Sequence, residues 1–313
     1  MRAVPSPTED PASFAATDAV VDTPAGWVTR LSLGSRTYDV TDRALVMGIL
    51  NRTPDSFYDK GLTFGLGDLV DRAAVLVADG ADLLDVGGVK AGPGPEVDEE
   101  EELHRVIPAV EALSARFDVP LSVDTWRASV ARTAYAAGAV VGNDISGFAD
   151  PDYLAVAAEA GASVVATHIR LAPRVPDPEP VYEGGDVVGA VRAFLVERAG
   201  RARAAGIPAE RIVLDAGLDL GKTAGQSLEL LRASAELAGL GHPLLLSASN
   251  KTFLGAVLDL PIDQRGPASL GAASLGVALG CRIVRVHDVA GHRQVCDVLA
   301  AISRVRRGLG WDA

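Results

Sequence analysis

The chain has 313 residues, of which 48% are hydrophobic, 22% charged and 5% aromatic. This is the composition of a globular protein with ample material for a core, and it excludes a disordered, collagen-like or disulfide-stapled chain. The 41 acidic residues outnumber the 29 basic ones and give a net charge of −12. No broad basic surface is therefore available for nucleic acid or anionic lipid, and an anionic ligand must be held by a few local donors.

The first 26 residues are acidic and rich in Pro, Ala, Ser and Thr, without the apolar core of a signal peptide. We expect residues 1–26 to be a disordered tail and residues 27–313 to form one domain. Cys281 and Cys296 stand outside any CxxC or Cys/His cluster, which favours unpaired thiols in a cytoplasmic protein. The longest uncharged stretch near the C-terminus, residues 266–281, is too short to span a bilayer.

The first predicted element is a small β-hairpin. Two apolar segments, residues 27–33 and 38–40, flank the turn sequence Gly34-Ser35-Arg36. We expect this hairpin to precede the main fold and to close one end of it.

From Leu45 onward, short apolar runs alternate with segments of helical period, the pattern of βα units around a parallel sheet. The segments 103–113, 187–195 and 295–305 each keep their apolar residues on one helical face. No G-x-G-x-x-G turn marks an open Rossmann sheet. The sequence therefore predicts an α/β fold, a single (β/α)₈ TIM barrel with a short N-terminal β-hairpin. The strand candidates are residues 45–51, 82–86, 121–124, 139–144, 163–168, 212–215, 244–248 and 283–287.

Polar residues follow every predicted strand, at the barrel end where active sites of this architecture lie. Asp124, Asn143 and Asp215 would offer two carboxylates and an amide to a flat heterocycle that bears ring N–H and amino groups. The alternative is that the two aspartates cap the helices that follow. Lys251 could donate to a ring carbonyl, and the helix start after it could hold a carboxylate, unless the lysine is a solvated surface charge.

Asn51, Arg285 and His287 form a second predicted set, made of donors without a compensating carboxylate cluster. The first and eighth strands are neighbours in a closed barrel, so these residues would meet and could bind phosphate or pyrophosphate. His287 as a core or capping histidine is the alternative. Residues 51–66 and 87–97 are Gly/Pro-rich loops that either close over a ligand or simply connect elements.

These segments resemble the dihydropteroate synthases and their pterin-binding relatives. The resemblance rests on residues 47–57, 85–88, 122–125, 143–147, 214–217 with 221–222, 249–251 and 285–288, which occur in the family's order. It implies a TIM barrel, usually homodimeric, that condenses a dihydropterin methyl pyrophosphate with p-aminobenzoate and releases pyrophosphate with Mg²⁺.

The resemblance also implies roles for individual residues. Asp124, Asn143, Asp215 and Lys251 match the pterin-binding positions, and Asn51, Arg285 and His287 match the pyrophosphate site, with Asn51 also a metal ligand. Asp124, Lys251, Arg285 and His287 would carry catalysis. In the implied mechanism, the C–O bond breaks to a pterin methyl cation stabilised near Asp124, while Arg285, His287, Asn51 and the metal take up the charge on pyrophosphate.

The chain departs from the family pattern in its loops. Where the family commonly has Glu-Ser-Thr-Arg-Pro-Gly, residues 89–94 read Val-Lys-Ala-Gly-Pro-Gly, so Ala91 and Gly92 replace Thr and Arg. Asn250 replaces the Arg of Ser-Arg-Lys, and Leu220 replaces the Phe of Phe-Gly-Lys. The pattern resembles the divergent second paralogue of some actinobacteria. Three functions stay open: a working dihydropteroate synthase, a non-catalytic pterin-binding protein, and a pterin enzyme with another amine or a folate methyl carrier.

Overall fold

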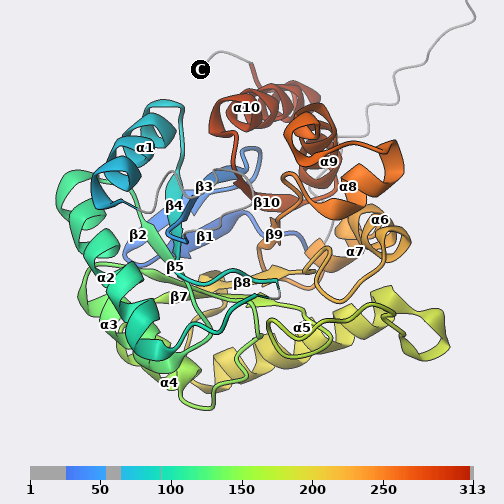
Figure 1. The fold of residues 1–313 in the computed structure, drawn as a ribbon. Helices are drawn as coiled ribbons and strands as arrows, with labels where there is room; N and C mark the ends of the chain where they lie inside the picture. Colours follow the sequence, from blue (N-terminus) through green and yellow to red (C-terminus); the bar gives the residue numbers. More distant parts are fainter. Residues whose placement is uncertain (1–25, 54–64, 93, 311–313) are drawn as a thin grey trace, which may run out of the picture.

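The computed structural model describes residues 26–53, 65–92 and 94–310, which contain a closed barrel of parallel strands with helices outside it (Figure 1). The predicted tail lies almost wholly outside the described residues, as does most of the 51–66 loop. The barrel strands are β3 (Leu45–Asn51), β4 (Leu83–Gly87), β5 (Leu121–Asp124), β6 (Val141–Asp144), β7 (Ser163–Thr167), β8 (Ile212–Asp215), β9 (Leu244–Leu246) and β10 (Cys281–Val286).

The strand order β10-β3-β4-β5-β6-β7-β8-β9 closes on itself, because β10 pairs in parallel with both β3 and β9. The predicted TIM barrel is confirmed. The surrounding α-helices are α1 (Leu66–Ala78), α2 (Glu99–Arg116), α3 (Ala128–Ala136), α4 (Tyr153–Glu159), α5 (Val187–Ala204), α6 (Ala224–Arg232), α7 (Ser234–Ala238), α8 (Thr252–Leu258), α9 (Gly266–Ala278) and α10 (Val289–Arg306). Short 3₁₀ turns cover Glu183–Gly185, Ala209–Arg211 and Ile262–Gln264.

The predicted hairpin is confirmed as β1 (Arg30–Leu33) and β2 (Arg36–Asp39), which pair antiparallel. Gly34 in its turn has φ +59, and a Cβ there would lie 2.8 Å from that of Val140, so only glycine fits. Leu31 and Leu33 pack against the first residues of the barrel strands, in a cluster with Leu45, Met47, Leu83, Val141, Val165, Val213, Leu245 and Ile283. The hairpin therefore closes the end of the barrel opposite the strand C-termini.

Both cysteines are buried and unpaired, as expected. In the described part of the chain, no helix is long and apolar enough to cross a membrane.

Candidate active site

The C-terminal ends of four adjacent strands place three of the predicted residues side by side. The register pairs Asn51 with Gly87, Gly87 with Asp124, and Asp124 with Asn143. A Cβ built on Gly87 would lie 3.6 Å from Asn51 Oδ1 and 3.5 Å from the Cβ of Asp124. The amide and the carboxylate thus flank a position that carries no side chain, at the mouth of the barrel.

Arg285 on β10 crosses the mouth and joins this group. Its Nε donates to Asp85 Oδ2 at 2.6 Å, and its Nη2 donates to Asp124 Oδ2 at 2.8 Å. Asn143 Nδ2 donates to the same Asp85 oxygen at 3.1 Å. The expectation that Arg285 belongs to a set without compensating carboxylates was therefore wrong, because a guanidinium that is only 16% exposed needs charge partners.

Two carboxylates share this single guanidinium. Burial raises the pKa of Asp124 to about 7, with Arg285 opposing the shift and Asp85 adding to it. Asp85 is fully buried, and its Oδ1 has no hydrogen-bond partner among the described residues, nor has the neighbouring Ser122 Oγ. Since buried polar atoms normally have partners, the floor of the mouth offers unused polar atoms to a ligand.

Asp215 and Lys251 lie on the other side of the mouth. Asp215 Oδ1 accepts from Gly217 N at 2.8 Å, and Lys251 Nζ donates to Leu218 O at 2.6 Å. Burial raises the pKa of Asp215, and Lys251 lowers it. Burial also lowers the pKa of Lys251, which Asp219 and Asp215 oppose. Lys251 is thus a partly buried, charge-coupled lysine and not a solvated surface charge.

The helix-cap alternative for the two aspartates was wrong. The first amide of α3, Ala128 N, is bound by Asp150 at 2.9 Å, so Asp124 does not cap that helix. Thr223 caps α6 in a reciprocal arrangement with Gln226, so Asp215 does not cap it either. Both carboxylates remain directed to the mouth.

The start of α8 is already occupied by the protein itself. Asp219 Oδ2 accepts from Thr252 N at 2.5 Å and from Thr252 Oγ1 at 2.7 Å, and Asp219 Oδ1 accepts from Phe253 N at 3.2 Å. The helix start that was expected to hold a ligand carboxylate therefore holds a carboxylate of this chain.

A buried lysine organises the turn between β8 and α6. Lys222 Nζ lies 2.8 Å from Gly217 O, 2.9 Å from Leu220 O and 2.9 Å from His168 Nδ1. Burial lowers the pKa of Lys222 to about 7 and that of His168 to about 3, so the ring of His168 is neutral and its Nδ1 accepts from Lys222 Nζ. The lysine links the β7 end to the turn whose Leu218 carbonyl holds Lys251.

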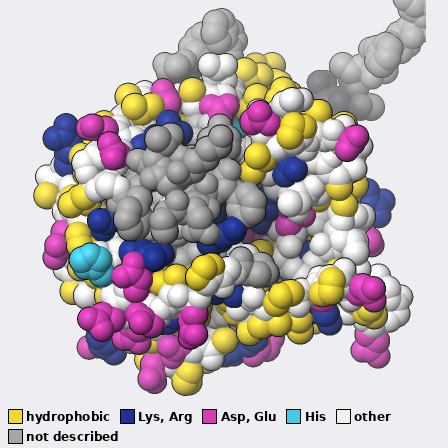
Figure 2. All heavy atoms as spheres, viewed as in Figure 1, with side chains coloured by type: hydrophobic (Ala, Val, Ile, Leu, Met, Phe, Trp, Pro, Cys, Tyr) yellow, Lys and Arg dark blue, Asp and Glu magenta, His cyan; other side chains and the backbone are white. Residues whose placement is uncertain are grey.

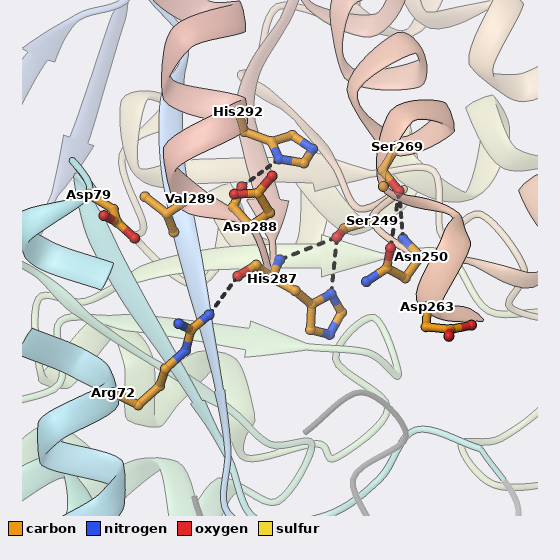
Figure 3. Close-up of a pocket in the computed structure, with 11 residues that line it drawn as sticks. Arg72, Asp79, Ser249, Asn250, Asp263, Ser269, His287, Asp288, Val289 and His292 are labelled. Atoms are coloured by element: carbon orange, nitrogen blue, oxygen red, sulfur yellow. Dashed lines mark hydrogen bonds between the residues drawn. The ribbon is translucent and has the colours of Figure 1, made fainter. Parts of the chain in front are cut away.

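His287 lies on the β10 side, next to Ser249. Its Nδ1 is 3.0 Å from Ser249 Oγ, and its carbonyl accepts from Arg72 at 2.9 Å (Figure 3). Behind it, a polar cavity of about 290 Å³ opens between α1, α9 and α10 (Figure 3). None of Asp124, Asn143, Asp215 and Lys251 lines that cavity, so it is not the site that brings those four residues together.

The loop after β4 is tied down by arginines. Arg105 donates to Gly88 O at 3.0 Å, Arg127 donates to Val97 O at 2.8 Å, and Arg174 from the loop after β7 donates to Pro95 O. On the face that carries these loops, Lys and Arg side chains lie around the central area, and acidic side chains lie both beside them and toward the margin (Figure 2).

Comparison with known proteins agrees with this geometry. The pterin binding enzyme family matches residues 47–287. The chain belongs to the dihydropteroate synthase family of pterin binding enzymes. It is 45% identical over 269 residues to the inactive dihydropteroate synthase 2 of Mycobacterium tuberculosis, covering 85% of each chain. It is 43% identical over 277 residues to the dihydropteroate synthase of Synechocystis, covering 88% of this chain and 95% of that one.

Among solved structures, the chain is similar to a Burkholderia cenocepacia dihydropteroate synthase complexed with 7,8-dihydropteroate. The TM-score is 0.80 at 40% identity, over 90% of this chain and 99% of the other. The resemblance inferred from the motifs is thereby confirmed.

Three residues of this pterin binding enzyme were missed as site residues. Asp85 lies two residues before Gly87, so its side chain points to the same face, and that period-two signal was available in the sequence. Asp219 binds Thr252, which lies 33 positions away, and Lys222 binds His168, which lies 54 positions away. No local pattern could have revealed those contacts.

Proposed function

We propose that the chain is a dihydropteroate synthase-type transferase of folate biosynthesis. It would condense a dihydropterin methyl pyrophosphate with p-aminobenzoate and release pyrophosphate. The observation that carries the proposal is the cross-barrel array in which Arg285 is shared by Asp85 and Asp124. Asp215 and Lys251 lie close enough to that array to interact with the charge of Arg285.

The array suits a pterin. Asp124, Asn143 and Asp215 would accept from the ring N–H and amino groups, and Lys251 would donate to the ring carbonyl. Asp85 then acts by holding Arg285 and Asn143 in place. The carboxylate of Asp124 would also stabilise the positive charge that develops on the methylene carbon as its C–O bond breaks.

The leaving pyrophosphate would lie toward β3 and β10. Arg285 uses its Nε and one Nη2 hydrogen for the two carboxylates, which leaves further guanidinium donors for phosphate oxygens. His287 and Asn51 lie at the ends of the same two neighbouring strands. The arylamine would then attack the carbon without a covalent enzyme intermediate.

Magnesium fits this site as a metal held mainly by the substrate. The described residues contain no cluster of three or more His, Cys, Asp or Glu side chains that could hold a metal ion. Mg²⁺ is commonly bound through one or two protein oxygens together with substrate phosphates and water, and the amide oxygen of Asn51 is such a ligand. When bound, the ion would neutralise charge on the pyrophosphate.

We propose that the protein is a cytoplasmic homodimer. Its two unpaired thiols suit a reducing compartment. On α10, Val298, Ile302 and Val305 recur at helical spacing and are 59%, 50% and 55% exposed, and Leu275 on α9 is 45% exposed. A second copy would cover this apolar face. Sedimentation equilibrium of wild type and of Ile302→Glu tests it, with dimer expected for the first and monomer for the second.

Pyrophosphate release tests the transfer reaction. Purified protein would be given dihydropterin pyrophosphate and Mg²⁺, with and without p-aminobenzoate. Release that depends on p-aminobenzoate supports the proposal, and Asp124→Asn should abolish it. Turnover unchanged by Asp124→Asn or by Lys251→Met would refute the roles given to those residues.

A non-catalytic pterin-binding protein is the second candidate. The altered 89–94 loop and the 45% identity to mycobacterial relatives named inactive favour it. Calorimetry that shows tight pterin binding without pyrophosphate release, under any amine, would select this candidate.

A further inference from the structure

Arg174 is a charged residue at the mouth end of the barrel that the proposed reaction does not use. It lies in the loop after β7, and its Nη2 donates to the carbonyl of Pro95 in the loop after β4, 79 positions away in the chain. A Cβ built on Gly94 would lie 3.4 Å from the same nitrogen. The guanidinium of Arg174 therefore lies directly against the backbone of the loop after β4.

This contact joins two loops that do not follow neighbouring strands. In the barrel order, β5 and β6 lie between β4 and β7. Both loops leave the C-terminal ends of their strands, so the bond from Arg174 to Pro95 reaches past the ends of β5 and β6. Those two ends carry Asp124 and Asn143. The bond thus connects loops on either side of two residues that we propose bind the pterin.

The loop after β7 is a firm support for this bond. Arg170 and Asp177 form an ion pair through two N–H groups, which ties the two arms of the loop together. The Tyr182 hydroxyl anchors the loop to the turn after β8 by donating to Gly221 O at 2.8 Å. Arg174 itself has φ +67, a left-handed conformation that a non-glycine residue keeps only where its surroundings fix it.

The loop after β4 needs such a support and carries a cation of its own. Gly92 and Gly94 give its backbone more conformational freedom than other residues would. Lys90 Cε lies 3.8 Å from the position of a Cβ on Gly92, so the lysine side chain runs along this loop. The loop begins at Gly87, which pairs with Asn51 at the end of β3. Lys90 therefore belongs to a loop that starts beside the proposed pyrophosphate site.

We infer that Arg174 is a positioning residue that fixes the loop after β4 at the mouth and thereby holds Lys90 beside the leaving pyrophosphate. This inference rests on the proposed function, since it concerns the departure of pyrophosphate. It assigns a purpose to an arginine that is built into a strained turn and bonds to a backbone carbonyl of a distant loop.

The experiment uses full-length wild type, Arg174→Ala, Arg174→Lys, Lys90→Ala and the double variant of Arg174→Ala with Lys90→Ala. Arg36→Ala is the matched control, because Arg36 donates to Asp118 O at 2.9 Å, 82 positions away, at the closed end of the barrel. The first readout is kcat for pyrophosphate release. The second is the rate at which trypsin cleaves after Lys90, followed by mass spectrometry, because cleavage within a folded protein requires the loop to open.

Arg174→Ala should speed cleavage after Lys90 by about fivefold and lower kcat by about threefold, since one loop hydrogen bond is lost. Arg174→Lys should recover most of both, because the carbonyl of Pro95 needs only one donor. In the Lys90→Ala background, Arg174→Ala should lower kcat no further, because it acts through Lys90. Arg36→Ala should change neither readout.

Faster cleavage after Lys90 in Arg174→Ala, without pyrophosphate release by any of the proteins, supports the positioning of the loop and refutes the proposed transfer. Pyrophosphate release with losses that multiply in the double variant supports transfer and overturns the inference. An unchanged cleavage rate in Arg174→Ala, or an equal increase in Arg36→Ala, also overturns it.

Discussion

The two sides of the barrel mouth are built differently. On one side, Asp85, Asp124, Asn143 and Arg285 all lie on strands, and their side chains bond directly to one another across the barrel. On the other side, Lys222 and Lys251 bond mainly to backbone carbonyls of a single turn. The strand side is fixed by the fold, whereas the turn side depends on a few loop residues. Residues of the strand side are therefore expected to tolerate little change, and residues of the turn side to tolerate more.

The largest effect is expected from breaking the strand side. Asp85→Ala leaves Arg285 buried with one carboxylate in place of two, and removing one partner of a buried ion pair costs about 3–5 kcal/mol. The free energy of unfolding in urea should fall by about that amount, and pterin affinity by more than tenfold. Glu159→Gln is the control, because its pair with Arg132 is exposed and is worth less than about 1 kcal/mol. Equal losses in the two variants would contradict the comparison.

The pH dependence of stability probes the turn side. The pKa of Lys222 is lowered to about 7 in the fold and is near 10.5 in the unfolded chain. Between these values the unfolded state binds the extra proton, so stability rises with pH. Between pH 7.5 and 9, the unfolding free energy of wild type should rise by about 2 kcal/mol relative to Lys222→Met.

Comparison with the variant cancels the titration of the buried thiols Cys281 and Cys296, whose pKa values burial raises. His168 stays neutral in both states over this range, since its pKa is about 3 in the fold and near 6.5 in the unfolded chain. Parallel pH profiles of the two proteins would show that Lys222 does not release its proton on folding.

A smaller effect, confined to turnover, is expected from the loop after β4. Lys90 lies two residues before Gly92, where the family commonly has an arginine, and can supply a cation there. Lys90→Ala should lower kcat by about fivefold through lost charge stabilisation and leave the pterin Kd unchanged. Lys90→Arg should retain most of the wild-type rate. A drop in pterin affinity would instead place Lys90 with the strand side.

The smallest effect is expected from Tyr182→Phe. The Tyr182 hydroxyl donates to Gly221 O at 2.8 Å and links the loop after β7 to the turn after β8. Removing it should lower the unfolding free energy by about 1 kcal/mol in urea titrations, with pterin binding unchanged. A loss as large as that of Asp85→Ala would mean that the turn side is as rigid as the strand side.

The sequence predicted the barrel, the hairpin and most residues of the strand side, because strand ends are read from local patterns. Observed and predicted strand bounds differ where turns begin. Strand β9 ends at Leu246, two residues before the predicted end at residue 248, and the chain then turns through Asn250, whose φ is +57. The partners of Arg285 lie 200 and 161 residues away in the chain, so its pairing could not be predicted from any local pattern. The capping of α8 by Asp219 likewise appears only in three dimensions.

The hairpin at the closed end has a consequence for the order of folding. Leu31 and Leu33 leave the ribosome before any barrel strand, yet one of their partners, Ile283, lies on the last strand to be made. The neighbours β3 and β10 are likewise separated by more than two hundred residues. During synthesis, the apolar face of the hairpin and the edge of β3 that pairs with β10 stay uncovered until the C-terminal quarter of the chain has been made. Barrel closure and sealing of its base are thus late steps, with aggregation as the competing outcome.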